Sequence, residues 1–401
     1  MAVSRRRIRR RRVIVAASIL GVASVAGLSS GIAVGMGSSP AKAAQSQKHQ
    51  PRKHTARPQQ PQVKTGPPSS KTRLRYVKTI GGSISPKSVV SSEHGLVFAQ
   101  NMMYQHTVTV YNDRTRRLVK TISDAVNLTK YGVRGHPGTS RGAPVELAVT
   151  PDGKYAYVSN YSMYGSGFGG EGTDDCYQNQ FGPSFVYRID IAKLKIDDAI
   201  QVGPVPKYVA VTPDGRFVLV TNWCGYDVSI VSTRLGRQVK SLPLGPYPRG
   251  IVVTPNSKTA YIAVMGSSNI ARLDLEHWKI SWLYGVGSGP RHLVISPKGR
   301  WLYATLNGEG TVAKIDLRKG AVVRKVSTGN APRSMAISPD GKALYVVNYF
   351  SNTVSKVRTG DMSVIQTVPT NASPIGITYD TPTRSVWVAC YSGSIMVFTD
   401  G

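Results

Sequence analysis

A fixed spacing between prolines constrains the fold of this chain more than any other feature of its sequence. Pro213, Pro255, Pro297 and Pro339 follow one another at intervals of 42 residues, and each opens a turn between two apolar segments. A second set of prolines precedes these turns by seven residues, and it comprises Pro144, Pro206, Pro248, Pro290, Pro332 and Pro374, with Pro86 in a degraded first copy. Seven units of about 40 residues with four short strands each predict an all-β fold, a seven-bladed β-propeller of four-stranded blades.

The last unit is one strand short. Residues 393–399 supply its third strand and the chain ends at Gly401, whereas residues 75–80 resemble the fourth strands of other units, such as 118–122. An unpaired strand edge is a liability that a propeller removes by closing its ring. The sequence therefore predicts that the N-terminal strand completes the last blade.

The second strand of several units carries a short Tyr-Val-X-Asn pattern. It occurs at 157–160 and 345–348, with a close variant at 219–222. Through these strands, residues 76–401 resemble the YVTN family of propellers, a family of bacterial exported or surface proteins. Three units depart from the pattern, because Val264 and Cys390 replace the Asn and the fifth unit shifts it to Asn307. The resemblance implies the propeller fold, and related propellers include lactonases, lyases and metal-dependent hydrolases.

The N-terminal region divides into two parts that precede the propeller of residues 75–401. Residues 1–43 combine an arginine-rich start, an uncharged apolar stretch and an Ala-Lys-Ala site, which predicts a secretory signal peptide or an uncleaved membrane anchor. Residues 44–74 are basic and rich in Pro and Gln, which predicts a disordered linker. Both alternatives place the propeller outside the cytoplasm, extracellular or associated with the cell envelope, with membrane contact only through the N-terminal segment.

The charge of the chain is strongly positive, at +30. Sixteen of the 51 basic residues precede residue 76 and no acid precedes Glu93, so the repeats keep a net charge of +14. This charge favours an anionic partner. No dedicated nucleic-acid motif is present, and export argues against specific nucleic-acid binding.

Five of the seven residues that follow the leading prolines are cationic. This position opens the innermost strand of each blade, so the five side chains are expected to encircle one mouth of the central channel. We predict a ligand-binding set at this mouth that consists of Lys87, Lys207, Arg249, Arg291 and Arg333, with His292 beside Arg291. A structural alternative is that these cations cap strand ends.

The cysteines provide one further prediction. Cys176 lies in the long loop after Asn160, and Cys224 lies two residues after the equivalent Asn222. Loops at the same repeat position in adjacent blades lie on the same face, and an oxidising compartment favours disulfides. We therefore predict a Cys176–Cys224 disulfide, whereas Cys390 is expected to be a buried thiol.

No catalytic motif, metal-ligand spacing or cofactor signature stands out in the sequence. We therefore predict no catalytic residues, no metal and no cofactor, and favour a non-enzymatic, monomeric binding or scaffold protein of the cell envelope. Its expected partner is an anionic envelope polymer, a small anionic ligand or a protein. The alternative is a propeller enzyme of the lyase or lactonase type that acts at the channel mouth or the long loops.

Overall fold

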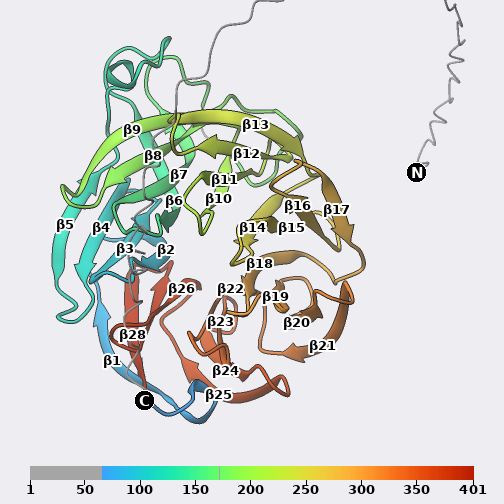
Figure 1. Cartoon of the computed structure of the whole chain (residues 1–401). Helices are drawn as coiled ribbons and strands as arrows, with labels where there is room; N and C mark the ends of the chain where they lie inside the picture. The colour runs from blue at the N-terminus through green and yellow to red at the C-terminus, as the bar shows by residue number, and fades with distance from the viewer. Residues whose placement is uncertain (1–65, 171) are drawn as a thin grey trace, which may run out of the picture. The chain divides into compact units, whose positions relative to one another are not determined.

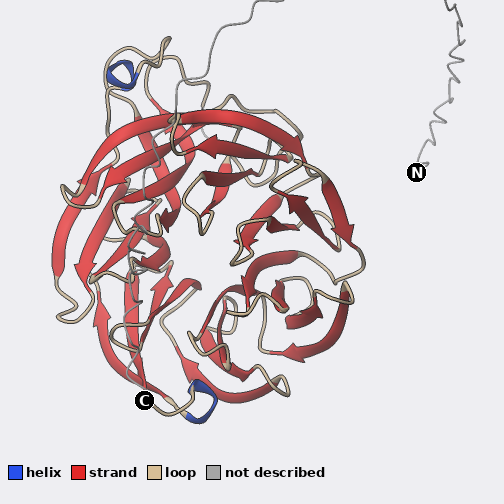
Figure 2. Ribbon diagram, viewed as in Figure 1, coloured by secondary structure: helices blue, strands red, loops and turns tan. Residues whose placement is uncertain are grey.

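The computed structural model describes residues 66–170 and 172–401. These residues form seven antiparallel four-stranded sheets arranged as the blades of a propeller (Figure 1), which confirms the predicted fold class. Within the described part of the chain, helical structure is confined to two short 3-10 segments, η1 Ser69–Lys71 and η2 Leu128–Tyr131 (Figure 2). The predicted signal or anchor segment and residues 44–65 of the predicted linker lie outside the described residues.

The strands follow the repeat, with the innermost strand first in each blade. Blade 1 holds β2 Pro86–Ser91, β3 Leu96–Asn101, β4 Thr107–Asn112 and β5 Leu118–Ser123; blade 2 holds β6 Arg141–Val149, β7 Tyr155–Tyr164, β8 Ser184–Asp190 and β9 Lys195–Val202; blade 3 holds β10 Pro206–Val211, β11 Phe217–Asn222, β12 Asp227–Ser232 and β13 Arg237–Pro243. Blade 4 holds β14 Pro248–Val253, β15 Thr259–Val264, β16 Asn269–Asp274 and β17 Ile280–Leu283; blade 5 holds β18 Pro290–Ile295, β19 Trp301–Leu306, β20 Thr311–Asp316 and β21 Ala321–Ser327; blade 6 holds β22 Pro332–Ile337, β23 Ala343–Asn348, β24 Thr353–Arg358 and β25 Ser363–Pro369. Blade 7 holds β26 Pro374–Asp380, β27 Ser385–Cys390, β28 Ser394–Asp400 and, as its outermost strand, β1 Leu74–Ile80.

The proline-led turns between first and second strands show why the period is so regular. In blade 3, the hydroxyl of Thr212 donates to Oδ1 of Asp214 at 2.6 Å, and the backbone N–H of Gly215 donates to the carbonyl of Thr212 at 2.7 Å. Gly215 has a φ of 72°, which a residue without a Cβ adopts easily. The ring of Pro213 fixes its own φ at a value that suits the start of a turn. The sequence Thr-Pro-Asp-Gly therefore favours a single tight turn.

Burial decreases from the middle of each blade to its outer edge. The second strand of blade 3, β11, is almost entirely buried, whereas the outermost strand of the same blade, β13, is largely exposed. A blade packs against a neighbour on both faces, so its middle strands are apolar on both sides. The hydrophobic core is accordingly divided into clusters that lie mainly between adjacent blades.

The ring is closed by the N-terminal strand, as predicted. β1 pairs antiparallel with β28, and the register runs from Leu74 opposite Asp400 to Ile80 opposite Ile395. Figure 1 shows this strand, in blue, beside the red C-terminal strands. Residues 66–73, within the range predicted as linker, also contact the propeller: the N–H of Ser69 donates to Oδ2 of Asp340 at 2.9 Å. None of the described residues belongs to a helix long and apolar enough to cross a membrane.

Candidate functional site at the mouth of the channel

The five predicted cations converge at one end of the axial channel. Each follows the proline that opens an inner strand, and these strands pack side by side around the axis (Figure 1). Their side chains are far from freely solvated: Lys87, Lys207, Arg249 and Arg291 are 2–8% exposed, and Arg333 is half-buried. Regular repetition therefore places one cation from each of five blades at a common mouth.

Burial, followed by repulsion from the other cations, lowers the proton affinity of the two lysines at the mouth. Burial, followed by Lys207, Arg249 and Arg291, lowers the pKa of Lys87 well below its usual value. Burial also lowers the pKa of Lys207 to about 7, with Arg249 acting in the same direction and Asp174 opposing it. Arginine remains protonated under such conditions, so the mouth carries concentrated positive charge.

Only one of the five cations has a carboxylate partner among the described residues. Lys207 forms an ion pair with Oδ1 of Asp174, which also accepts from the hydroxyl of Tyr161 at 2.9 Å. Burial disfavours ionisation of Asp174, but Lys207 outweighs this and lowers the pKa of Asp174. The side chains of Lys87 and Arg249 have neither an ion pair nor a hydrogen bond within residues 66–170 and 172–401.

A layer of aromatic and thioether side chains surrounds the cations. These side chains come from the residue after the second-strand Asn position in five of the seven blades, and sequence reasoning did not identify them. The signal was present, because four of the seven residues at that position are aromatic. The contacts are Lys87 Nζ to the Tyr391 ring at 5.0 Å, Lys207 Nζ to Tyr161 at 4.1 Å and Trp223 at 5.0 Å, Arg333 Cζ to Tyr349 at 3.6 Å, and Arg291 Nη1 to Met265 Sδ at 3.6 Å. Ring faces attract cations, which partly compensates for their burial.

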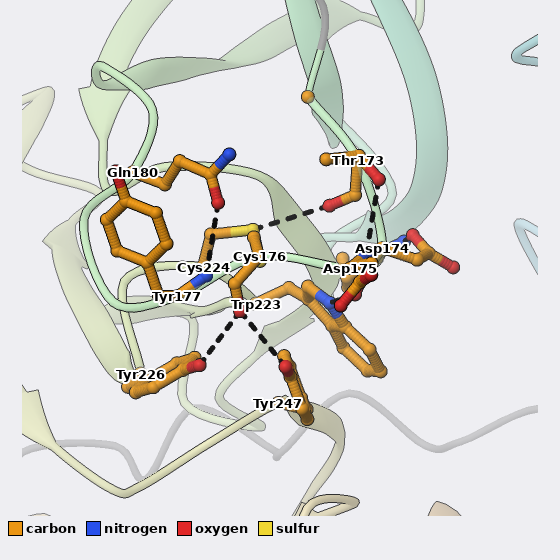
Figure 3. Close-up of a disulfide and its surroundings, with 12 residues drawn as sticks. Thr173, Asp174, Asp175, Cys176, Tyr177, Gln180, Trp223, Cys224, Tyr226 and Tyr247 are labelled. Carbon is orange, nitrogen blue, oxygen red and sulfur yellow. Dashed lines mark hydrogen bonds and ion pairs between the residues drawn. A yellow bond between two sulfur atoms is a disulfide. The ribbon is translucent and has the colours of Figure 1, made fainter. Parts of the chain in front are cut away.

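The structure joins Cys176 and Cys224 in a disulfide, with their Cα atoms 5.9 Å apart. This bond ties the long loop between β7 and β8 to the neighbouring blade 3 (Figure 3). The third cysteine, Cys390, is a free and buried thiol, and burial raises its pKa to about 12.

Aromatic side chains also hold the segment that carries the disulfide. The indole N–H of Trp223 donates to the carbonyl of Asp174 at 2.9 Å, and the hydroxyls of Tyr226 and Tyr247 donate to the carbonyl of Cys176 at 2.9 and 3.0 Å. Figure 3 shows this arrangement. The loop is therefore held so that Asp174 reaches Lys207 at the mouth, a placement that no repeat pattern in the sequence predicts.

A second layer of polar residues lies one position further along the inner strands. It lines an axial cavity of about 460 Å³ and comprises Ser88, Glu146, Tyr208, His292 and Ser334. Glu146 is 7% exposed, and burial raises its pKa to about 7, although Arg249, a hydrogen bond from Ser88, and Lys87 act in the opposite direction. Gly250 and Gly376 occupy the same position in their strands, where a Cβ would lie 2.7 Å or less from the backbone of the adjacent inner strand.

His292 belongs to this deeper layer rather than to the mouth itself. Its Nε2 lies 3.0 Å from the hydroxyl oxygen of Tyr208, and its Nδ1 accepts from the N–H of Met335 at 3.4 Å. Burial, Arg249 and Arg291 lower the pKa of His292 to about 3, so its ring is neutral at neutral pH. Both ring nitrogens are therefore engaged within the protein, which sets His292 apart from the five cations.

Comparisons with known proteins relate the chain to other proteins mainly through its fold. A family model described as the cytochrome D1 heme domain matches residues 277–392. Among solved structures, hydrazine synthase from Kuenenia stuttgartiensis has a TM-score of 0.63 and 20% sequence identity, with 79% of this chain and 96% of that chain covered. Comparison with curated proteins gives no match. At this identity, the structural likeness supports the propeller fold alone.

Proposed function

We propose that this propeller is a non-enzymatic binding protein that holds an oxyanionic ligand, a carboxylate, phosphate or sulfate group, at the mouth of its channel. One observation carries the proposal: Lys87 and Arg249 are buried and unpaired among the described residues, in the company of three further cations. Arg249 and the other cations repel Lys87, and no described carboxylate forms an ion pair with Lys87 or Arg249. A bound oxyanion would supply the missing partner.

The side chains at the mouth suit an oxyanion better than a halide. Arg249, Arg291 and Arg333 each present a planar guanidinium, which can donate two parallel hydrogen bonds to a carboxylate or phosphate. The low-dielectric walls of a channel also focus the field of these charges onto the axis. The ligand is therefore a small oxyanion or one anionic group of a cell-envelope polymer.

We place this binding outside the cytoplasm, on two kinds of support. The sequence of residues 1–43 has the layout of an export signal or anchor, and the Cys176–Cys224 disulfide suits an oxidising compartment. Fractionation of cells that express the full chain tests the location, because recovery in the cytosolic fraction would contradict it. Membership of the YVTN family remains a prediction.

The partial match to a cytochrome D1 heme domain suggests haem as a second candidate ligand. The cations of the mouth fit the carboxylates of such a group, but haem iron also needs an axial ligand. His292 is the only histidine that lines the axial cavity in the described part of the chain, and both of its ring nitrogens are engaged. Met265 Sδ already accepts from Arg291. The cations of the described mouth therefore fit the carboxylates of haem, whereas neither His292 nor Met265 is free to bind its iron.

The first test measures oxyanion binding by titration calorimetry of the full chain with sulfate, a glycerol-phosphate wall polymer and haemin. The variant Arg249→Gln/Arg291→Gln/Arg333→Gln should weaken sulfate binding at least tenfold and reduce its dependence on salt. A matched control with the same charge change is Arg114→Gln/Arg234→Gln/Arg318→Gln, which alters exposed arginines in turns away from the mouth and should bind like the wild type.

Comparison of the three ligands shows which kind of anion the mouth binds. Binding of both sulfate and polymer through the three arginines indicates a polymer receptor, whereas sulfate binding alone indicates a small-molecule site. Tight haemin binding with spectroscopic signs of axial ligation would replace the proposal with a haem protein. Equal affinities in the mouth variant and the control would show that the five cations are structural.

A further inference from the structure

Glu146 is the only carboxylate among the described residues that line the axial cavity. It lies on β6, next to Val145, the residue at the register of the five cations in blade 2. The pairing of β6 with β7 is irregular between Pro144 and Leu147, so Glu146 sits within the irregularity. Blade 2 therefore places an acid at the axis, just below the level at which five other blades place cations.

The surroundings of Glu146 are unusual for a carboxylate. The charged and titratable groups that face it are Lys87 on β2, Tyr208 on β10, Arg249 on β14, and Arg291 with His292 on β18. It forms no ion pair with any of the three cations, and the hydroxyl of Ser88 on the adjacent strand β2 donates to the carbonyl of Val145 at 2.8 Å. His292 is neutral, and Tyr208 stays protonated because burial, followed by Glu146, raises its pKa. Glu146 is thus the acid through which this layer can exchange a proton near neutral pH.

We propose that Glu146 in its protonated form donates a hydrogen bond to the oxyanion at the mouth, so that binding takes up a proton from solvent. This inference rests on the proposed function of the mouth. Adjacent residues of a strand are about 3.4 Å apart, so the carboxyl group lies within reach of an anion held by the cations above it. The donated proton makes Glu146 select for ligands with an accepting oxygen.

The direction of the pH dependence follows from this geometry. The pKa of Glu146 in the free protein is already raised to about 7 by burial, and a second negative charge nearby raises it further. Binding is therefore strongest below pH 7 and weakens as pH rises through the pKa of the bound state. Lys207, with a pKa of about 7, also gains affinity for its proton when an anion binds, so its contribution must be separated from that of Glu146.

Sulfate separates these contributions because it does not itself titrate between pH 6 and pH 8. We expect the Kd of the full chain for sulfate to rise at least about fivefold from pH 6 to pH 8, with proton uptake measured directly in a lightly buffered solution. Glu146→Gln keeps a donor without a titrating proton, so its affinity for sulfate should fall less between pH 6 and pH 8 than that of the wild type, and the loss that remains comes from the lysines at the mouth. Its proton uptake should fall by at least half, and the lysines Lys207 and Lys87, whose pKa values burial lowers, account for the remainder.

Two further variants test whether the proton uptake and the hydrogen bond belong to Glu146. Asp174→Asn removes the partner that supports protonation of Lys207, so it should alter only the Lys207 share of the proton uptake, and Glu146→Gln should lower the uptake in this background as well. Glu146→Ala removes the donor as well as the proton, and should bind sulfate more weakly than Glu146→Gln at every pH. Equal proton uptake in the wild type and Glu146→Gln would overturn this inference alone. Failure of the wild type to bind sulfate at any pH would overturn the mouth as an oxyanion site.

Discussion

Lys356 and Asp400 form a fully buried ion pair close to the seam where the two ends of the propeller domain meet. The ammonium group of Lys356 also donates to the carbonyl and hydroxyl oxygens of Thr72, at 2.8 and 2.7 Å, and Tyr345 donates to the carboxylate of Asp400. Blade 6, the last strand of the chain and the segment before β1 thus share one polar network. Its groups are mutually satisfied, which a buried ion pair requires.

Replacing Lys356 by Met should cost about 3–5 kcal/mol of unfolding free energy, because Asp400 would remain buried without its cation. Chemical denaturation of the propeller variants measures this loss. Lys342→Met alters an exposed lysine on the same blade and should change the stability by less than about 0.5 kcal/mol. A loss below about 1 kcal/mol for Lys356→Met would show that the network does not stabilise the seam.

The cations and the aromatic residues of the mouth differ in how readily the sequence reveals them. A cation recurs directly after the leading proline in five blades, so the period alone predicts the position of Arg249 or Arg291. The aromatic partners recur after the second-strand Asn, but packing explains an aromatic residue there equally well until a cation is placed over its ring. Asp174 could not be predicted, because it lies in a long loop without any repeat.

Strand β1 is the element that closes the ring. Leu74 at its start is 4% exposed, and the strand covers the edge of β28 that would otherwise offer unpaired backbone groups. Before it, η1 and Thr72 contact blade 6 and Asp400. Deletions that end before or after β1 can therefore separate its contribution to thermal stability from that of the preceding residues.

Deletion of residues 1–65 should leave the Tm of the propeller unchanged, whereas deletion of residues 1–82 should lower it by at least about 5 °C, because the second deletion removes β1 and the Thr72 contacts. Thermal unfolding followed by circular dichroism measures both. The shorter deletion serves as the control, since it retains η1. Equal Tm values for the two proteins would mean that the blade is stable without its outer strand.

At the scale of the elements, the 42-residue period predicted most of the strands that form the ring of blades. Proline spacing and turn chemistry predicted the blades, and the missing last strand predicted closure by residues 75–80. The start of the ordered propeller was less predictable, because Gly66–Arg73 have a linker-like composition and are fixed by specific contacts with Asp340 and Asp400. Such contacts depend on tertiary structure and leave no local pattern.

At the scale of the whole molecule, the mouth exists only because the ring is closed. Lys87 and Arg333 are 246 positions apart in the chain, yet they belong to the same ring of cations. Five blades each contribute one cation at the axis, so no single blade or pair of blades contains the site. The disulfide and the aromatic layer then add Asp174 as the one described ion-pair partner at the rim.

The most direct test of the oxyanion site is to locate a bound anion. Crystals of the propeller soaked in selenate should show an anomalous difference peak on the channel axis, within hydrogen-bond reach of the Arg249 and Arg291 side chains, and Arg249→Gln/Arg291→Gln/Arg333→Gln should abolish it. Selenate bound only at surface lysines, with an empty mouth in the wild type, would contradict the account.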